Sequence, residues 1–192
     1  MKYSNEKINS KCRKLLKQIV EIELDMFTRV RSLQPSLCQE RPKTFKIMRE
    51  MTHYVLSENT LKSYLLDLKK ALNNNRNLIT EKYARMNNQI PPLKDNPIIN
   101  DIVRIERDWM NDLITQYPLT FKKHSTNFKI YLSCELETYS DETLDLYFRD
   151  ISNAKEQGRN LAQERFLHLF QEIGYNSIEE VEEKSKINEK ST

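Results

Sequence analysis

The chain has 192 residues, with 31 Lys and Arg against 28 Asp and Glu and a formal net charge of +3. This length suits one domain or two small ones, and it can bury a sizeable core without disulfides or metals. Only two Gly and six Pro are present, which excludes collagen-like, low-complexity and turn-rich all-β chains. The near-neutral charge excludes a strong polyanion binder and an acidic disordered chain.

The sequence predicts a cytoplasmic protein. Its N-terminal stretch is basic but has no apolar core of the kind found in secretory signals. No stretch approaches 18 apolar residues, so we expect no membrane association through a spanning helix. Cys12, Cys38 and Cys134 are odd in number and have no CxxC spacing, which predicts neither a disulfide framework nor a zinc ribbon.

Charge is distributed unevenly along the chain. Residues 1–50 carry 12 basic and 6 acidic side chains, whereas residues 135–192 carry 7 and 14. No basic run interleaved with aromatic residues accompanies this asymmetry, so nucleic-acid binding is not favoured. Charge complementarity within one molecule or between copies explains it equally well, and the oligomeric state stays open.

In chain order, the first predicted element is a helix, because apolar residues recur at helical spacing over 16–30. After a Pro-containing connection, a shorter helix begins near Thr44. Ser57 has the properties of an N-cap for a third helix. That helix ends at Asn75, a residue type that tolerates the left-handed conformation of a C′ position. A fourth helix begins at 76–78.

The same series of elements returns 83 residues later. Comparison of residues 16–83 with 99–166 gives 19 identities without a gap. The longest matching stretches are IVEIELDM and IVRIERDW (19–26 and 102–109), FKI and FKI (45–47 and 128–130), and the pair that begins at Ser57 and Ser140. Such self-similarity at a fixed spacing predicts a tandem duplication.

These patterns predict one all-α domain over residues 1–192, built from two copies of a four-helix unit of about 70 residues. No convincing period-2 run is present, and we expect some eight main helices related by a pseudo-two-fold axis. The predicted parts are repeat one (15–86), a linker (87–97), repeat two (98–169) and an acidic C-terminal tail (175–192).

Glu23 and Glu106 occupy the middle of an apolar stripe at the same place in both repeats. A carboxylate removed from water needs a partner. The predicted partners are the recurring residues Arg76 and Arg159 with Asn77 and Asn160, and the candidate phenolic donors are Tyr64 and Tyr147. One interpretation is a buried Glu–Arg pair that braces each repeat. The alternative is a cavity on which both carboxylates converge.

An arginine at a helix N-terminus is a good anion receptor, because free backbone N–H groups and the guanidinium both suit phosphate or carboxylate. Arg49 and Arg85 occur in one repeat only, which makes them further candidates. The candidate ligand-binding residues are Glu23, Arg49, Arg76, Asn77, Arg85, Glu106, Arg159 and Asn160.

Glu50 and His53 form an E-x-x-H pattern, which in a helical bundle raises the alternative of a carboxylate-bridged metal site with Glu23 and Glu106. The matching stretch of the other repeat, 133–136, has no His, so half of such a motif is missing. No Gly-rich phosphate loop or nucleophile elbow is present. No cofactor is implied by a motif, catalytic residues stay unknown, and enzymatic activity stays open.

Several stretches in this order resemble the domain of unknown function 4125 family. They are TFKIMR (44–49), RNL (76–78) with EKYARM (81–86), GRNL (158–161) and Gly174-Tyr175. The resemblance covers about residues 15–180. Leu24 departs from the family pattern, which tends to have Trp there, and Leu33-Gln34-Pro35 replaces a Gly-rich connection. The resemblance implies a small, cytoplasmic, prokaryotic helical protein and brings no established activity.

We therefore expect a binding module for a small anionic or zwitterionic ligand or for a partner enzyme. The alternative is a metal-dependent enzyme of a helical-bundle type.

Overall fold

The computed structural model describes residues 10–30, 41–121 and 127–190, and its regular structure there is entirely α-helical, which confirms the all-α prediction. The stretch 31–40, with Leu33-Gln34-Pro35 and Cys38, lies outside the described residues. The helices are α1 (Ser10–Thr28), α2 (Pro42–His53), α3 (Glu58–Asn73), α4 (Leu78–Met86), α5 (Ile98–Gln116), α6 (Phe128–Leu136), α7 (Asp141–Glu156), α8 (Leu161–Glu172) and α9 (Ile178–Lys190).

The helix ends follow the predicted signals. Ser57 and Ser140 are N-caps, and the side chain of each accepts a hydrogen bond from the backbone N–H three residues later. Asn75 and Gly158 follow α3 and α7 with positive φ values of 56° and 68°. Both lie in the left-handed region, as predicted for Asn75.

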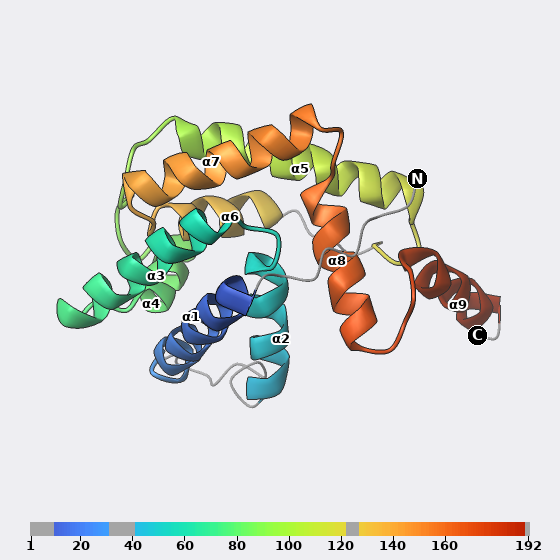
Figure 1. The fold of residues 1–192 in the computed structure, drawn as a ribbon, viewed down its shortest axis with the longest axis horizontal. Helices are drawn as coiled ribbons and strands as arrows, with labels where there is room; N and C mark the ends of the chain where they lie inside the picture. The colour runs from blue at the N-terminus through green and yellow to red at the C-terminus, as the bar shows by residue number, and fades with distance from the viewer. Residues whose placement is uncertain (1–9, 31–40, 122–126, 191–192) are drawn as a thin grey trace.

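The helices of the two predicted repeats are packed across each other. Helix α1 contacts α2, α3 and α4, while α5 contacts α6, α7 and α8. In addition, α2 packs on α8, α4 packs on α6, and α3 packs on α7, as Figure 1 shows. Each predicted repeat therefore covers apolar faces of the other, and one core runs through both.

That core contains the apolar stripes predicted from the sequence. Ile19 of α1 and Ile102 of α5 are fully buried, as are Leu61 of α3 and Leu144 of α7. Burial of such side chains contributes about 1.5–3 kcal/mol each and is the main reason why these sequences hold their helices together.

The acidic segment at the C-terminus is helical over most of its length. Helix α9 packs on α8 at one end of the molecule (Figure 1). Ile178 is buried, and the buried carboxylate of Glu182 accepts hydrogen bonds from the backbone N–H groups of Leu119 and Thr120 and from the Thr120 hydroxyl. The segment predicted as a tail is therefore a docked helix. None of the described helices is both long and apolar enough to cross a membrane.

Candidate functional site

Glu23 lies in the middle of α1 and is fully buried, as its place in the apolar stripe predicted. Arg49 of α2 binds both carboxylate oxygens, through Nε to Oε2 at 2.9 Å and through Nη2 to Oε1 at 2.6 Å. The Tyr64 hydroxyl donates to Oε1 at 2.7 Å, and Nε2 of His53 lies 3.1 Å from that oxygen. Two helices, α2 and α3, thus supply hydrogen-bond donors to one carboxylate of α1.

Glu135 near the end of α6 joins this cluster from the other predicted repeat. Arg49 Nη2 donates to its Oε1 at 2.7 Å, and Lys82 Nζ donates to Oε2 at 3.1 Å. The Tyr139 hydroxyl donates to Oε1 at 3.3 Å. We call the two carboxylates and four of the side chains that bind them the first network. Each of the six residues is exposed by 4% or less: Glu23, Arg49, His53, Tyr64, Lys82 and Glu135.

Both carboxyl groups of the first network are ionised at neutral pH in spite of their burial. Burial raises the pKa of Glu23, but the charge and hydrogen bonds of Arg49 outweigh it and hold that pKa at about 2. The pKa of Glu135 lies well below its usual range, because burial is again outweighed by the charges of Arg49 and Lys82. Two carboxylates and two cations therefore balance each other.

The hydrogen-bond pattern also sets the role of His53. Both hydrogens of Arg49 Nη2 are directed to carboxylates, so His53 Nε2 is assigned as a donor to Glu23. The other ring nitrogen, Nδ1, is buried and has no hydrogen-bond partner among the described residues. Such an unpaired buried atom is uncommon in a folded protein.

Glu106 belongs to a smaller buried group, which we call the second network: Glu106, Tyr147 and Arg165. Arg165 donates from Nη1 to Oε2 at 2.6 Å and from Nη2 to Oε1 at 2.8 Å, and the Tyr147 hydroxyl donates to Oε1 at 2.8 Å. Burial lowers the pKa of Arg165, but the charge of Glu106 outweighs it, so the guanidinium stays charged.

The predicted arginine partners of the two carboxylates were wrong, whereas the predicted phenolic donors Tyr64 and Tyr147 do bind Glu23 and Glu106. Arg76 donates to Glu81 at 2.7 Å and Arg159 donates to Glu164 at 2.7 Å, both in half-exposed ion pairs. The cations that bind Glu23 and Glu106 are instead Arg49 and Arg165. Arg76 and Arg159 recur because each pairs with a recurring Glu five residues later, so their recurrence reports a surface contact.

Three other candidates have contacts that hold the fold together. Asn77 and Asn160 cap α4 and α8, and their side-chain amides also donate to the backbone oxygens of Met26 and Trp109. Arg85 forms an ion pair with Glu137 at 2.7 Å and a hydrogen bond to the linker.

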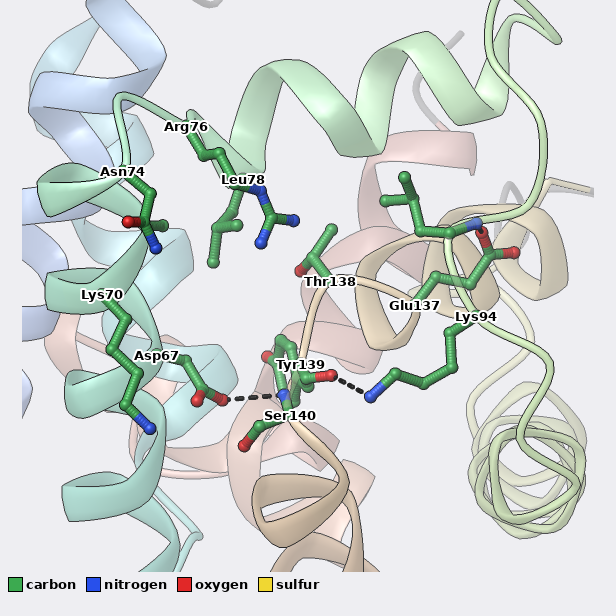
Figure 2. Close-up of a pocket in the computed structure, with 12 residues that line it drawn as sticks. Asp67, Lys70, Asn74, Arg76, Leu78, Lys94, Glu137, Thr138, Tyr139 and Ser140 are labelled. Carbon is green, nitrogen blue, oxygen red and sulfur yellow. Dashed lines mark hydrogen bonds between the residues drawn. The ribbon is translucent and has the colours of Figure 1, made fainter.

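A pocket with a volume of about 350 Å³ lies between α3, the start of α4, the linker and the turn between α6 and α7. Figure 2 shows three basic side chains around it: Lys70 of α3, Arg76 before α4, and Lys94 of the linker. Arg76 extends its guanidinium between Leu78 and Thr138. It is one of the candidates named from the sequence.

The carboxylates that line this pocket already have partners within the protein. Asp67 accepts from the backbone N–H of Ser140 at 2.9 Å and from the Thr143 hydroxyl at 2.6 Å. Glu137 is held by Arg85 and by the backbone N–H of Leu93. Of the three cations, Lys94 pairs with Asp141 at 2.8 Å and Arg76 pairs with Glu81, whereas Lys70 has no ion pair with any described residue. Its ammonium group is available to an anion in the pocket.

The four residues of the metal alternative do not come together at one site. Glu23 and His53 are neighbours in the first network, whereas Glu50 is exposed and Glu106 binds Arg165. Within the described ranges, no group of three or more His, Cys, Asp and Glu side chains is arranged to hold a metal ion.

Sequence reasoning missed Lys70, Lys94 and Glu135, because they looked like ordinary surface charges. A usable signal was present for Lys70 and Glu135. Each of these two charges falls in one repeat only: 83 residues away, the chain has Asn153 for Lys70 and Thr52 for Glu135.

Comparison with the curated proteins and with the solved structures gave no significant match. The family model described as "Protein of unknown function (DUF4125)" matches residues 13–183, which is most of the chain and agrees with the resemblance seen in the sequence. The chain therefore belongs to the DUF4125 family.

Proposed function

We propose that this protein binds a small anionic molecule, such as a phosphate monoester, in the pocket around Lys70, Arg76 and Lys94. The observation that carries the proposal is the ammonium group of Lys70, which has no ion pair among the described residues, beside the cations of Arg76 and Lys94. The carboxylates that line the pocket have oxygens already occupied by protein donors. Its volume of about 350 Å³ falls in the range of small-molecule sites. An ammonium and a guanidinium group both suit phosphate oxygens.

We also propose that the chain is a tandem duplication arranged about a pseudo-two-fold axis between α3 and α7. This is supported by reciprocal contacts, in which an Asp of each of these helices binds the N-cap region of the other. Asp150 accepts from the backbone N–H of Ser57 and from the Thr60 hydroxyl. Asp67 accepts in the same way from the backbone N–H of Ser140 and from the Thr143 hydroxyl. Helix pairs also recur in this way, since α2 packs on α8 as α6 packs on α4.

The duplication gives a reason to assign Lys70 to a ligand rather than to the fold. Arg76 has the equivalent Arg159, with the same ion pair, but Lys70 corresponds to Asn153. Helix α7 is therefore built without that cation. The presence of Lys70 on one side only supports a function at that side.

Calorimetric titration with inorganic phosphate and glycerol phosphate at low salt tests the proposal. We expect Arg76→Gln and Lys70→Asn each to weaken binding about tenfold, which corresponds to about 1.4 kcal/mol. The matched control is Arg159→Gln, because Arg159 has the same kind of ion pair and a similar exposure, 47% against 50% for Arg76. This control should leave the affinity unchanged.

Two results would contradict the proposal. One is the absence of binding by the wild-type protein to both phosphates. The other is an equal loss of affinity in Arg76→Gln and Arg159→Gln, which would mean that binding depends on surface charge in general.

A further inference from the structure

The first and second networks occupy equivalent places but differ in composition. Glu23 and Tyr64 correspond to Glu106 and Tyr147, at the 83-residue spacing, and both tyrosines donate to their glutamate. The second network needs only Arg165 to complete it. The first network adds a second carboxylate, a second cation and an imidazole, all of them buried.

The additional groups of the first network have apolar or neutral counterparts. Arg49, His53 and Glu135 correspond to Leu132, Leu136 and Thr52, while Lys82 corresponds to Arg165. Leu136 is 1% exposed, and Leu132 packs against the core. The equivalent helices around the second network therefore pack without those charges.

Buried charges are a poor way to gain stability. Desolvation offsets much of the attraction between buried ions, and apolar replacements of similar volume are often neutral or stabilising. Since the second network shows such a replacement within the same chain, the fold gives no reason for the additional charges. A role outside folding accounts for them better.

A continuous series of contacts leads from these charges to the pocket. Arg49 and Lys82 bind the carboxylate of Glu135, and that carboxylate accepts from the Tyr139 hydroxyl. The backbone oxygen of Tyr139 accepts from Lys94 Nζ at 2.7 Å, as Figure 2 shows. Tyr139 also lies in the pocket wall, in the turn between α6 and α7.

From these contacts we infer that Glu135, held by Arg49 and Lys82, is a positioning residue of the anion pocket. It fixes the ring of Tyr139, and through it the turn of residues 137–140 and the site of Lys94. The inference rests on the proposed function of the pocket, since it assigns the first network to the binding of that same ligand.

The test is a variant that gives the first network the composition of the second: Arg49→Leu, His53→Leu, Lys82→Arg and Glu135→Thr combined. We expect it to fold with a melting temperature close to that of the wild type. Its affinity for glycerol phosphate should fall about tenfold or more. The control is Arg159→Gln, which changes an arginine outside both networks and outside the pocket, with the affinity retained.

Hydrogen exchange of the ligand-free variant supplies a second readout. The amides of Thr138, Tyr139 and Ser140 are hydrogen bonded in the turn, at 3.0, 3.0 and 2.9 Å. In the combined variant they should exchange about tenfold faster, with α5 unchanged. If the wild type binds no phosphate but the turn loosens in this way, the pocket assignment fails and the positioning role stands.

Two outcomes would overturn the inference. If the combined variant folds, binds glycerol phosphate as the wild type does and keeps its turn protected, the first network does not position the pocket. If the combined variant cannot fold, the additional charges serve the fold, which is the opposite of what we infer.

Discussion

Glu106 and Arg165 form a closed buried pair, in which each charge depends on the other. We predict that Glu106→Ala lowers the free energy of unfolding by about 3–5 kcal/mol, because it leaves the guanidinium buried without its counter-ion. Urea unfolding measures this difference. The control is Glu164→Ala, which removes an exposed ion pair and should cost about 1 kcal/mol or less. Equal losses in the two variants would contradict a special role of the buried pair.

The first network predicts a loss of stability in acid. The pKa of Glu23 is about 2 in the folded protein, against an ordinary value of 4.5. A lowered pKa stabilises the folded state above about pH 4.5, and this contribution is lost as the pH falls toward 2. We expect the melting temperature to fall steeply across this interval. In Glu23→Gln the fall should be shallower, and an unchanged slope would show that Glu23 does not contribute.

The burial of Glu23 and Glu106 could be predicted from the sequence, because helical periodicity gives the face on which a side chain lies. Their phenolic donors Tyr64 and Tyr147 could also be predicted, but their cationic partners could not be. Arg49 and Arg165 come from other helices, and their approach depends on how those helices pack. The repeat comparison pointed to Arg76 and Arg159. A residue can occur in both repeats because it forms a surface ion pair in each, as readily as because it forms a buried one.

At the scale of elements, α3 and α7 cap each other through their Asp residues. We predict that Asp67→Ala and Asp150→Ala each destabilise the protein by about 0.5–2 kcal/mol, the usual range for loss of an N-terminal cap interaction. Chemical denaturation of both variants, with the exposed Asp145→Ala as control, measures this. A loss in only one of the two variants would show that the reciprocal contacts are not equivalent.

Helix α9 is attached through the carboxylates of Glu179 and Glu182 and the buried side chain of Ile178, without a broad apolar face. We predict that Glu182→Ala releases α9, so that limited proteolysis removes it while the rest of the chain stays protected. The exposed neighbour Glu183→Ala should be cleaved no faster than the wild type. Equal cleavage of the two variants would show that Glu182 does not anchor the helix.

The starts of α3, α4, α7 and α8 were predictable, because Ser and Asn caps act through local chemistry. Helix α9 was not, since its sequence is mostly charged and offers no apolar stripe. The backbone N–H groups of Leu119 and Thr120 that receive Glu182 cannot be recognised in a sequence, because any residue type carries them.

For the molecule as a whole, the crossed packing predicts that both predicted repeats unfold together. Helix α2 lies on α8, where the rings of Tyr54 and His168 stack at 3.7 Å, and α4 lies on α6. We expect calorimetry to give a single transition whose calorimetric and van't Hoff enthalpies agree. Leu61→Ala and Leu144→Ala should each lower the midpoint of the whole transition. A variant with two separate transitions would contradict this.

The all-α class followed from helical periodicity and the scarcity of glycine and proline, which are properties of the chain alone. No sequence feature predicted that α2 packs on α8 and that α4 packs on α6. Whether a helix packs on its own repeat or on the other one depends on loop lengths and on how well the helix surfaces fit. Both repeats present nearly the same apolar stripes, so the sequence does not distinguish the two arrangements.

This crossed arrangement also has a consequence for synthesis of the protein on the ribosome. Helix α2 ends at His53, and its partner α8 begins at Leu161, 108 residues later in the chain. At roughly 5–20 residues per second, the face of α2 that α8 covers stays open to other molecules for roughly 5–20 seconds during translation. The nascent first half is therefore a natural substrate for chaperones until the second half has emerged.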